Sequence, residues 1–364
     1  MLTKDDTGKL KGIAIILMMV HHLFGFPTRL PPSITIINIS NKVNVELALG
    51  IASKVCVALF LFVLGYGVVA SGNFSAKANM MRVIKFMKIY LYYAAIYLFI
   101  GYAFFRNQQL PLLGRAYSAI DYKQIAFNLF AIKYDYNPEW WFAREYIIYV
   151  LLLGFMPNPS KIKYGCVATV SILAFAFASH TSAPLPQSKL SFIIPLMYWQ
   201  YPFVMGAICA KFDLLKSRVL SLKLSMLSII VAACILYGHR RFGANASMLL
   251  MPIFAQSLLW LPFNASSKYS KILTSIGKLS FPIWLIHTGF CYYYFQTFIY
   301  SVRYSLAILL LLLISCYFTS CLLDYVRLQI EKAVKYIANL LASQFAICSP
   351  VDISSAFTKQ SKDR

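Results

Sequence analysis

Charge is scarce in this sequence, and negative charge is the scarcest. Charged residues make up 13% of the 364 positions, and only 12 residues are Asp or Glu. A soluble globular domain usually carries about 25% charged residues. The chain is instead 60% hydrophobic, and apolar stretches of about 20 residues, the length that spans a bilayer, recur from end to end. These proportions exclude a soluble globular domain and indicate a polytopic membrane protein.

Other classes of protein are excluded by patterns that are missing. The eight cysteines include no CxxC pair and no metal-ligand spacing, so neither a disulfide framework nor a metal site is expected. The chain has no glycine-rich phosphate loop, no internal repeat and no appended soluble domain. Its apolar stretches are too long for the alternating short strands of a β-barrel. Helices are therefore expected, because they satisfy every backbone polar group inside the membrane.

Positive charge is the one kind of charge that is plentiful. The chain has 34 lysines and arginines and a net charge of +22. In a membrane protein this excess is typical of basic cytoplasmic loops beside anionic headgroups, so membrane lipids are expected partners and nucleic acid is not. The excess also leaves room for an anionic substrate at the inner face.

The expected fold is all-α, a bundle of about ten transmembrane helices with both termini in the cytoplasm. With the N-terminus inside, about two-thirds of the lysines and arginines fall on the cytoplasmic side. Residues 1–342 are expected to form one integral membrane domain, and residues 343–364 a polar, mobile cytoplasmic tail. The spans are expected near residues 10–27, 55–71, 83–105, 141–156, 164–180, 190–211, 222–238, 245–263, 279–300 and 303–324.

The first span, KLKGIAIILMMVHHLFGFP at residues 9–27, carries polar residues at both ends. Lys11 and His22 are separated by eleven positions, which places them on nearly the same helix face, about 16 Å apart. Lys11 is either an ordinary cytoplasmic anchor or part of an anion site. His22 is either a hydrogen-bonded packing residue or a proton-transfer group, which an imidazole suits near neutral pH. His21 points away from this face and fits a packing role.

The stretch LKGIAIILMMVHH resembles the first-span signature of the membrane acyltransferase-3 family, a basic residue followed after ten positions by histidine. The family usually has arginine where this chain has Lys11, and lysine keeps the charge without the planar bidentate fork. Gly65 lies in the stretch 59–69, which is similar to the second span of the family, and is expected to be a small-residue notch where another helix packs. The stretches that resemble later spans of the family are LFLFVLGYGVV (59–69), MRVIKFMKIYLYY (81–93), NPEWWFAREYIIYVLL (137–152) and GKLSFPIWLIHTGF (277–290).

The third-span stretch supplies candidate residues for binding a donor substrate. Arg82, Lys85 and Lys88 stand three residues apart and therefore line one side of a helix that enters the membrane. They form either a solvated inner rim or, as the resemblance implies, a clamp for the phosphates of an acyl-coenzyme A together with Lys11.

Two further residues join His22 as candidate catalytic residues. Glu145 lies in an apolar helix, where it orients a histidine, binds sugar hydroxyls or forms a structural pair. His287 lies either near His22 across the bundle or bonded to a backbone carbonyl. The resemblance leaves open whether His22 deprotonates the acceptor hydroxyl directly or carries the acyl group transiently.

The resemblance implies a multi-pass O-acyltransferase of the plasma (inner) membrane. It would move an acyl group, commonly acetyl, from cytoplasmic acyl-coenzyme A to a hydroxyl of a cell-surface polysaccharide or its lipid-linked precursor. The alternative is a transporter or flippase for a glycan or glycolipid, because many spans with intramembrane charge also fit a carrier. Carriers often contain inverted repeats, which this sequence does not show.

Overall fold

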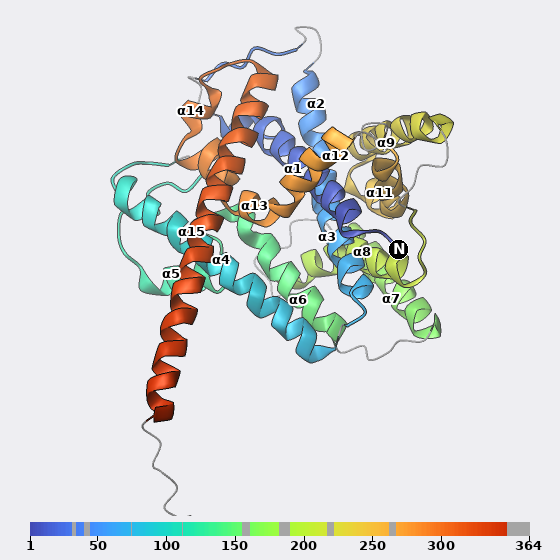
Figure 1. Cartoon of the computed structure of the whole chain (residues 1–364). Helices are drawn as coiled ribbons and strands as arrows, with labels where there is room; N and C mark the ends of the chain where they lie inside the picture. The colour runs from blue at the N-terminus through green and yellow to red at the C-terminus, as the bar shows by residue number, and fades with distance from the viewer. Residues whose placement is uncertain are drawn as a thin grey trace, which may run out of the picture. The chain divides into compact units, whose positions relative to one another are not determined.

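In the computed structural model, the described part of the chain consists of helices joined by turns and loops (Figure 1). The structure describes residues 1–30, 34–39, 44–73, 75–110, 112–154, 161–181, 190–216, 222–261 and 267–347, and these ranges contain only isolated β-bridges and no strand. The expected all-α fold is confirmed. The helices are α1 (Lys4–Phe24), α2 (Val45–Ala52), α3 (Cys56–Ala70), α4 (Ala76–Phe104), α5 (Tyr122–Leu129), α6 (Phe142–Gly154), α7 (Lys161–His180), α8 (Leu190–Lys211), α9 (Leu222–Phe242), α10 (Ala244–Leu249), α11 (Met251–Leu259), α12 (Ser267–Lys278), α13 (Ser280–Thr288), α14 (Gln296–Tyr300) and α15 (Ser305–Ile347).

Seven helical segments of the described chain are long and apolar enough to cross a membrane. This finding supports a multi-pass membrane protein. The expected total of ten spans and the cytoplasmic placement of both termini stay predictions. The seven segments are Lys4–Phe24, Val45–Ala70, Ala76–Phe104, Ile162–His180, Ile193–Lys211, Lys223–Phe242 and Ser305–Leu341.

Two of the expected spans differ from continuous membrane-crossing helices. The segment 245–263 is two short helices, because Pro252 lies in the first turn of α11 and cannot continue the hydrogen bonding of α10. The segment 279–300 is interrupted after α13 by a π-helical turn, η5 (Gly289–Tyr293). Within 141–156, the structure describes α6 over 13 residues, up to Gly154.

The chain divides into two compact units, Met1–Ser320 and Cys321–Arg364. Helix α15 begins in the first unit and continues into the second, where it ends at Ile347. Most of the expected tail at 343–364 lies outside the described residues, since the description ends at residue 347. All the residues of the candidate site lie in the first unit.

Helices α3 and α8 lie in close backbone contact. A Cβ atom at Gly65 would overlap the carbonyl oxygen of Phe203, and a Cβ atom at Gly206 would overlap that of Phe62. Small residues allow this approach between membrane helices, where packing supplies much of the attraction. The expected packing notch at Gly65 is confirmed, and the contact fixes α3 along one wall of the site.

Replacing Gly65 with valine is expected to lower the free energy of unfolding by about 1–3 kcal/mol or more, because the new side chain would push α3 away from α8. The thermal midpoint of the purified protein, followed by size-exclusion chromatography after heating, should fall clearly. Gly67→Ala is the matched control, since a Cβ atom at Gly67 meets nothing within 4 Å. Equal midpoints for the two variants would contradict the close-contact explanation.

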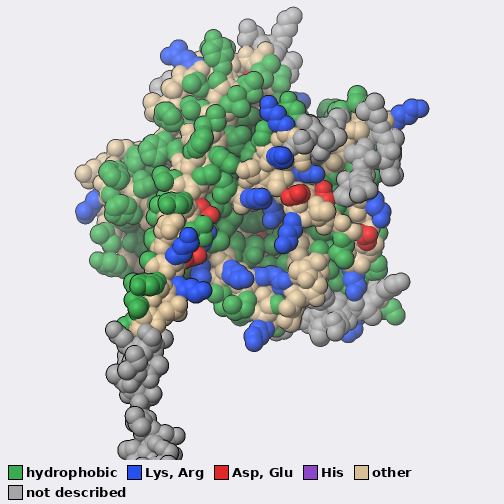
Figure 2. Space-filling model, viewed as in Figure 1, with side chains coloured by type: hydrophobic (Ala, Val, Ile, Leu, Met, Phe, Trp, Pro, Cys, Tyr) green, Lys and Arg blue, Asp and Glu red, His purple; other side chains and the backbone are tan. Residues whose placement is uncertain are grey.

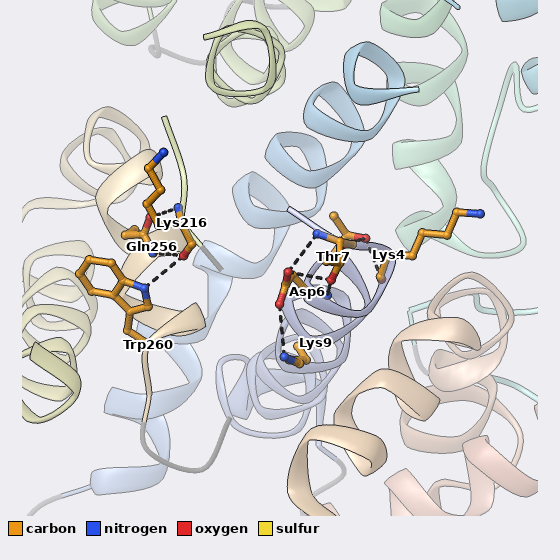
Figure 3. Close-up of polar contacts among 8 residues, drawn as sticks. Lys4, Asp6, Thr7, Lys9, Lys216, Gln256 and Trp260 are labelled. Atoms are coloured by element: carbon orange, nitrogen blue, oxygen red, sulfur yellow. Dashed lines mark hydrogen bonds and ion pairs between the residues drawn. The ribbon is translucent and has the colours of Figure 1, made fainter. Parts of the chain in front are cut away.

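Helix α1 is fixed at its start by a cap and along its length by α12. The Thr3 hydroxyl accepts a hydrogen bond from the Asp6 backbone N–H at 3.1 Å. The Asp6 carboxylate also pairs with Lys9 at 3.2 Å (Figure 3). A Cβ atom at Gly12 would overlap the backbone of Leu273 in α12. The register of α1, and with it the direction of its polar side chains, is therefore set by both local and tertiary contacts.

Figure 3 also shows how the chain beyond α8 is held against α11. The amide of Gln256 pairs with both backbone groups of Lys216, accepting from its N–H at 2.8 Å and donating to its carbonyl oxygen at 2.9 Å. The indole N–H of Trp260 donates to the same carbonyl at 3.1 Å. These bonds satisfy both backbone groups of Lys216, which lies beyond the end of α8.

Candidate active site

A cavity of about 730 Å³ lies between α1, α3, α4, α6, α8 and α13. Its walls are mostly apolar and aromatic, which suits an alkyl-like part of a substrate better than a free ion. Polar side chains enter it mainly at its two ends. The aromatic residues of the wall include Phe60, Phe86, Trp141, Phe142, Trp199 and Trp284.

One end of the cavity is cationic. Lys11 of α1 and Arg82 and Lys85 of α4 all line it. The guanidinium of Arg82 also donates to the hydroxyl of Ser71 at 2.6 Å, which places this end beside the C-terminus of α3. Figure 2 shows Lys and Arg side chains gathered around a hollow with a hydrophobic interior, in the region where Figure 1 draws α3, α6 and α13.

The structure separates Lys88 from the other predicted cations. Lys88 is exposed and does not belong to the described lining of the cavity, although it follows Lys85 by one turn. The three-residue spacing drifts around a helix of 3.6 residues per turn, so the last member of the series faces a different direction. Of the predicted cations, Lys11, Arg82 and Lys85 are therefore the ones placed to contact a molecule in the cavity.

Helix α1 forms the wall of the cavity from Lys11 to the pair His21 and His22. Lys11, Met18 and His22 line it as a stripe on one helix, over the roughly 16 Å between Lys11 and His22. His21 lines the cavity as well, although it was expected to point away from this face. The imidazole of His21 is also bonded to the carbonyl oxygen of Gly50 at 2.8 Å, as its expected packing role requires. His22 is thus the histidine whose ring is not committed to a backbone carbonyl.

His287 lies against His22, with 4.8 Å between the two ring centroids. Its Nδ1 donates to the carbonyl oxygen of Trp284 at 2.7 Å, so both alternatives considered for His287 are found together. Since Nδ1 carries the proton of the neutral ring, Nε2 carries a lone pair. Nε2 is buried and has no hydrogen-bond partner among the described residues.

Tyr292 fixes the other side of the His22 ring. The Tyr292 hydroxyl donates a hydrogen bond to the backbone carbonyl oxygen of His22. The hydroxyl oxygen of Tyr292 also lies 3.4 Å from Nδ1 of the His22 ring. A hydroxyl that donates to one group still accepts from another, so Tyr292 favours a proton on Nδ1. Nε2 of His22 is then the unprotonated nitrogen, which is the form required of a general base.

Glu139 is the carboxylate at this end of the cavity, and sequence reasoning did not select it. Its Oε2 lies 3.9 Å from His22 Nε2, and its Oε1 accepts a hydrogen bond from Arg29 at 2.8 Å. Burial by itself lowers the pKa of Arg29, but the hydrogen bond and negative charge of Glu139 outweigh burial and raise it. Arg29 therefore stays charged. The feature of the sequence that could have identified Glu139 is its position as a rare acidic residue beside the tryptophan pair of NPEWWF.

The short turn η3 (Pro138–Trp141) holds Glu139 in place relative to α13. Asn137 caps this turn by accepting from the Glu139 backbone N–H at 3.2 Å, and it donates to the Thr288 hydroxyl at 2.8 Å. The indole N–H of Trp140 donates to the carbonyl oxygen of Leu285 at 3.1 Å. Two buried bonds therefore tie the segment of Glu139 to the helix of His287.

Glu145 does not belong to the cavity in the described part of the chain. It is fully buried, and its Oε1 accepts a hydrogen bond from Arg144 at 2.7 Å. Glu145 lies in the first turn of α6, six positions beyond Glu139. Of the alternatives considered for Glu145, the structural pair is the one observed, and Glu139 occupies the place expected for a carboxylate beside a histidine.

The arrangement joins two kinds of chemistry in one cavity. The cationic end suits phosphate groups, and the apolar walls suit an uncharged arm that reaches inward. The other end holds an imidazole beside a carboxylate, which suits removal of a proton from a hydroxyl. A reaction between an anionic donor and a hydroxyl acceptor uses both ends at once.

Comparison with known proteins gives one match. A family model described as an acyltransferase domain, that of the acyltransferase-3 family, matches residues 10–324. No curated protein and no solved structure matches the chain. The family match covers the helices that build the cavity, including those that carry Lys11, His22 and His287. This multi-pass membrane protein belongs to the acyltransferase-3 family.

Proposed function

We propose that this protein is a plasma-membrane O-acyltransferase that moves an acetyl group from cytoplasmic acetyl-coenzyme A to a hydroxyl of a cell-surface polysaccharide or its lipid-linked precursor. The observation that carries the proposal is the single cavity that joins Lys11, Arg82 and Lys85 to His22. Donor and acceptor then meet inside the membrane although they come from opposite sides.

The donor would enter from the cationic end. The phosphates of coenzyme A would stay with Lys11, Arg82 and Lys85, because cations bind phosphate strongly through charge-assisted hydrogen bonds. The extended pantetheine arm would follow the apolar wall of α1 toward His22. A length of about 16 Å between Lys11 and His22 suits such an arm. The thioester would then lie beside the imidazole.

His22 would act as a general base. As the acceptor oxygen attacks the thioester carbonyl carbon, its proton passes to Nε2 of His22. The carbon–sulfur bond then breaks, and the imidazolium gives the proton to the leaving thiolate, which restores neutral His22 and yields free coenzyme A. The bond of Nδ1 toward Tyr292 supports this direction of transfer.

Glu139 would stabilise the imidazolium that forms on His22. Replacing Glu139 with glutamine keeps an oxygen for Arg29 but removes the negative charge 3.9 Å from His22 Nε2. We expect kcat to fall about 10- to 100-fold, since interactions with a charged group contribute about 1.5–3 kcal/mol. The KM for acetyl-coenzyme A should change little, because the phosphates bind at the other end.

Glu145→Gln is the matched control for Glu139→Gln. Both carboxylates pair with an arginine, but Glu145 does not line the cavity in the described structure. Steady-state kinetics on purified protein in lipid nanodiscs would separate kcat from KM for each variant. A larger loss of kcat for Glu145→Gln than for Glu139→Gln would reverse the assignment and return Glu145 to the site.

Two measurements test the function itself. Purified protein should transfer label from [¹⁴C]acetyl-coenzyme A to surface glycan extracted from cells that lack this protein. Nuclear magnetic resonance of that glycan should show the loss of an ester signal that wild-type glycan contains. Movement of a glycan across vesicles without any transfer of label would favour the transporter alternative and overturn the proposal.

A further inference from the structure

Lys54 also lies in the wall of this cavity. It belongs to η2 (Ser53–Val55), directly before α3, whereas Arg82 bonds to Ser71 directly after α3. The 17 positions between Lys54 and Ser71 correspond to about 25 Å of helix. The cavity therefore has a cation at each end, and the acyl-coenzyme A proposal uses only one of them.

Lys54 has no carboxylate partner among the described residues. Its side chain is exposed, and none of the ion pairs of the described chain includes it. The carboxylate of Glu139, which lines the same cavity, is already neutralised by Arg29 at 2.8 Å. The positive charge of Lys54 is therefore available to a molecule that enters the cavity.

η2 packs against α1, α2, α3, α9 and α10, and of these α9 adds positive charge while α2 carries Glu46. The Glu46 carboxylate is buried and accepts hydrogen bonds from the Ser305 hydroxyl at 2.7 Å and the Ile39 backbone N–H at 2.6 Å. It is therefore not paired with Lys54.

Helix α9 ends in His239, Arg240 and Arg241, and its His239 is bonded to the Ser247 hydroxyl of α10 at 2.6 Å. Both arginines are exposed. With the cationic donor end in the cytoplasm, this second basic group lies on the outer side, where lysine and arginine are not favoured by the topology rule.

We infer that Lys54 binds an anionic group of the acceptor, so that the substrate is an acidic glycan with a carboxylate or phosphate near the hydroxyl that is acylated. This inference rests on the proposed function. An anion held at Lys54 would fix the sugar at the histidine end of the cavity and present one hydroxyl to His22. Holding a reactant in one orientation is a large source of rate. The charge of the acceptor thereby selects which hydroxyl reacts.

The test uses glycan extracted from cells that lack this protein, since it contains the natural acceptor without its acyl group. One portion is left untreated, one is carboxyl-reduced and one is dephosphorylated. Purified wild-type protein is given [¹⁴C]acetyl-coenzyme A and each portion. We expect one treatment to lower kcat/KM about 10-fold or more, as loss of a charge-assisted contact does. The treatment that does so identifies the anionic group as carboxylate or phosphate.

Substitutions then connect the effect to this lysine. Lys54→Gln should raise the KM for untreated glycan about 10-fold and make the treated and untreated glycans nearly equal substrates. Lys54→Arg should keep the preference for the untreated glycan. Lys123→Gln, which removes an exposed lysine of α5 outside the described cavity wall, should leave the preference unchanged.

The outcomes separate this inference from the proposed function. No transfer by wild-type protein to untreated glycan would overturn the proposed function, and the inference with it. Equal transfer to untreated, carboxyl-reduced and dephosphorylated glycan would overturn the acidic acceptor alone. A preference for acidic glycan that persists in Lys54→Gln would show that another residue binds the anionic group of the acceptor. This result would overturn the assignment of Lys54.

Discussion

Replacing His22 with alanine is expected to slow acetyl transfer about 10²- to 10⁴-fold, the usual contribution of a positioned general base. The loss should appear in kcat, because the ring lies beside His287 and Glu139 rather than at the cationic end. The amount of folded protein in the membrane should stay close to wild type. Steady-state transfer from [¹⁴C]acetyl-coenzyme A to extracted glycan measures the effect.

His180→Ala is the control for the His22 prediction. His180 ends α7, is exposed, and does not belong to the described cavity wall. Its removal tests whether loss of any histidine impairs the protein. Transfer at the wild-type rate by a folded His22→Ala protein would overturn the assignment of the general base to His22.

The double variant Lys11→Gln/Lys85→Gln is expected to raise the KM for acetyl-coenzyme A about 10- to 100-fold. Each lysine lines the cationic end of the cavity, and contacts between charged groups contribute about 1.5–3 kcal/mol when well formed. Lys85 is exposed, so its share should be the smaller one. The value of kcat should change little, since the reacting atoms lie about 16 Å away.

Lys88→Gln is the matched control for the cationic end. It removes the same charge from the same helix, one turn beyond Lys85, at a position outside the described cavity wall. If the basic inner face attracts the donor only through its overall charge, Lys85→Gln and Lys88→Gln should raise the KM for acetyl-coenzyme A equally. Both increases should then disappear at high salt. A direct contact with the donor predicts a larger KM for Lys85→Gln alone. Equal increases in KM would therefore contradict the phosphate clamp.

The neighbours of His22 mark the limit of reasoning from sequence. The face shared by Lys11 and His22 follows from the geometry of one helix, and the structure keeps both in one wall. The nearness of His287 was one of two open alternatives, and Glu139 was not selected at all. Their positions depend on bonds from Asn137 and Trp140 to α13, which join residues more than 140 positions apart.

The segments 245–263 and 279–300 show a second limit. Their hydropathy predicts continuous spans, because hydropathy averages over a window and does not register where a helix breaks. Pro252 did indicate a break in the first segment, because proline has no backbone N–H to donate inside a helix. The π-helical turn after α13 has no comparable signal, and it helps place Tyr292 against His22.

The sequence by itself determined the all-helical membrane character of this protein and the stripe that carries Lys11 and His22, because composition and helix period are local properties. Only the tertiary structure decided that Glu139 rather than Glu145 lies beside His22, that Lys88 leaves the cavity wall, and that Lys54 enters it. The physical reason is that contacts between helices depend on where backbones can approach. That approach is set by packing at positions such as Gly65 and Gly12, far from the residues that react.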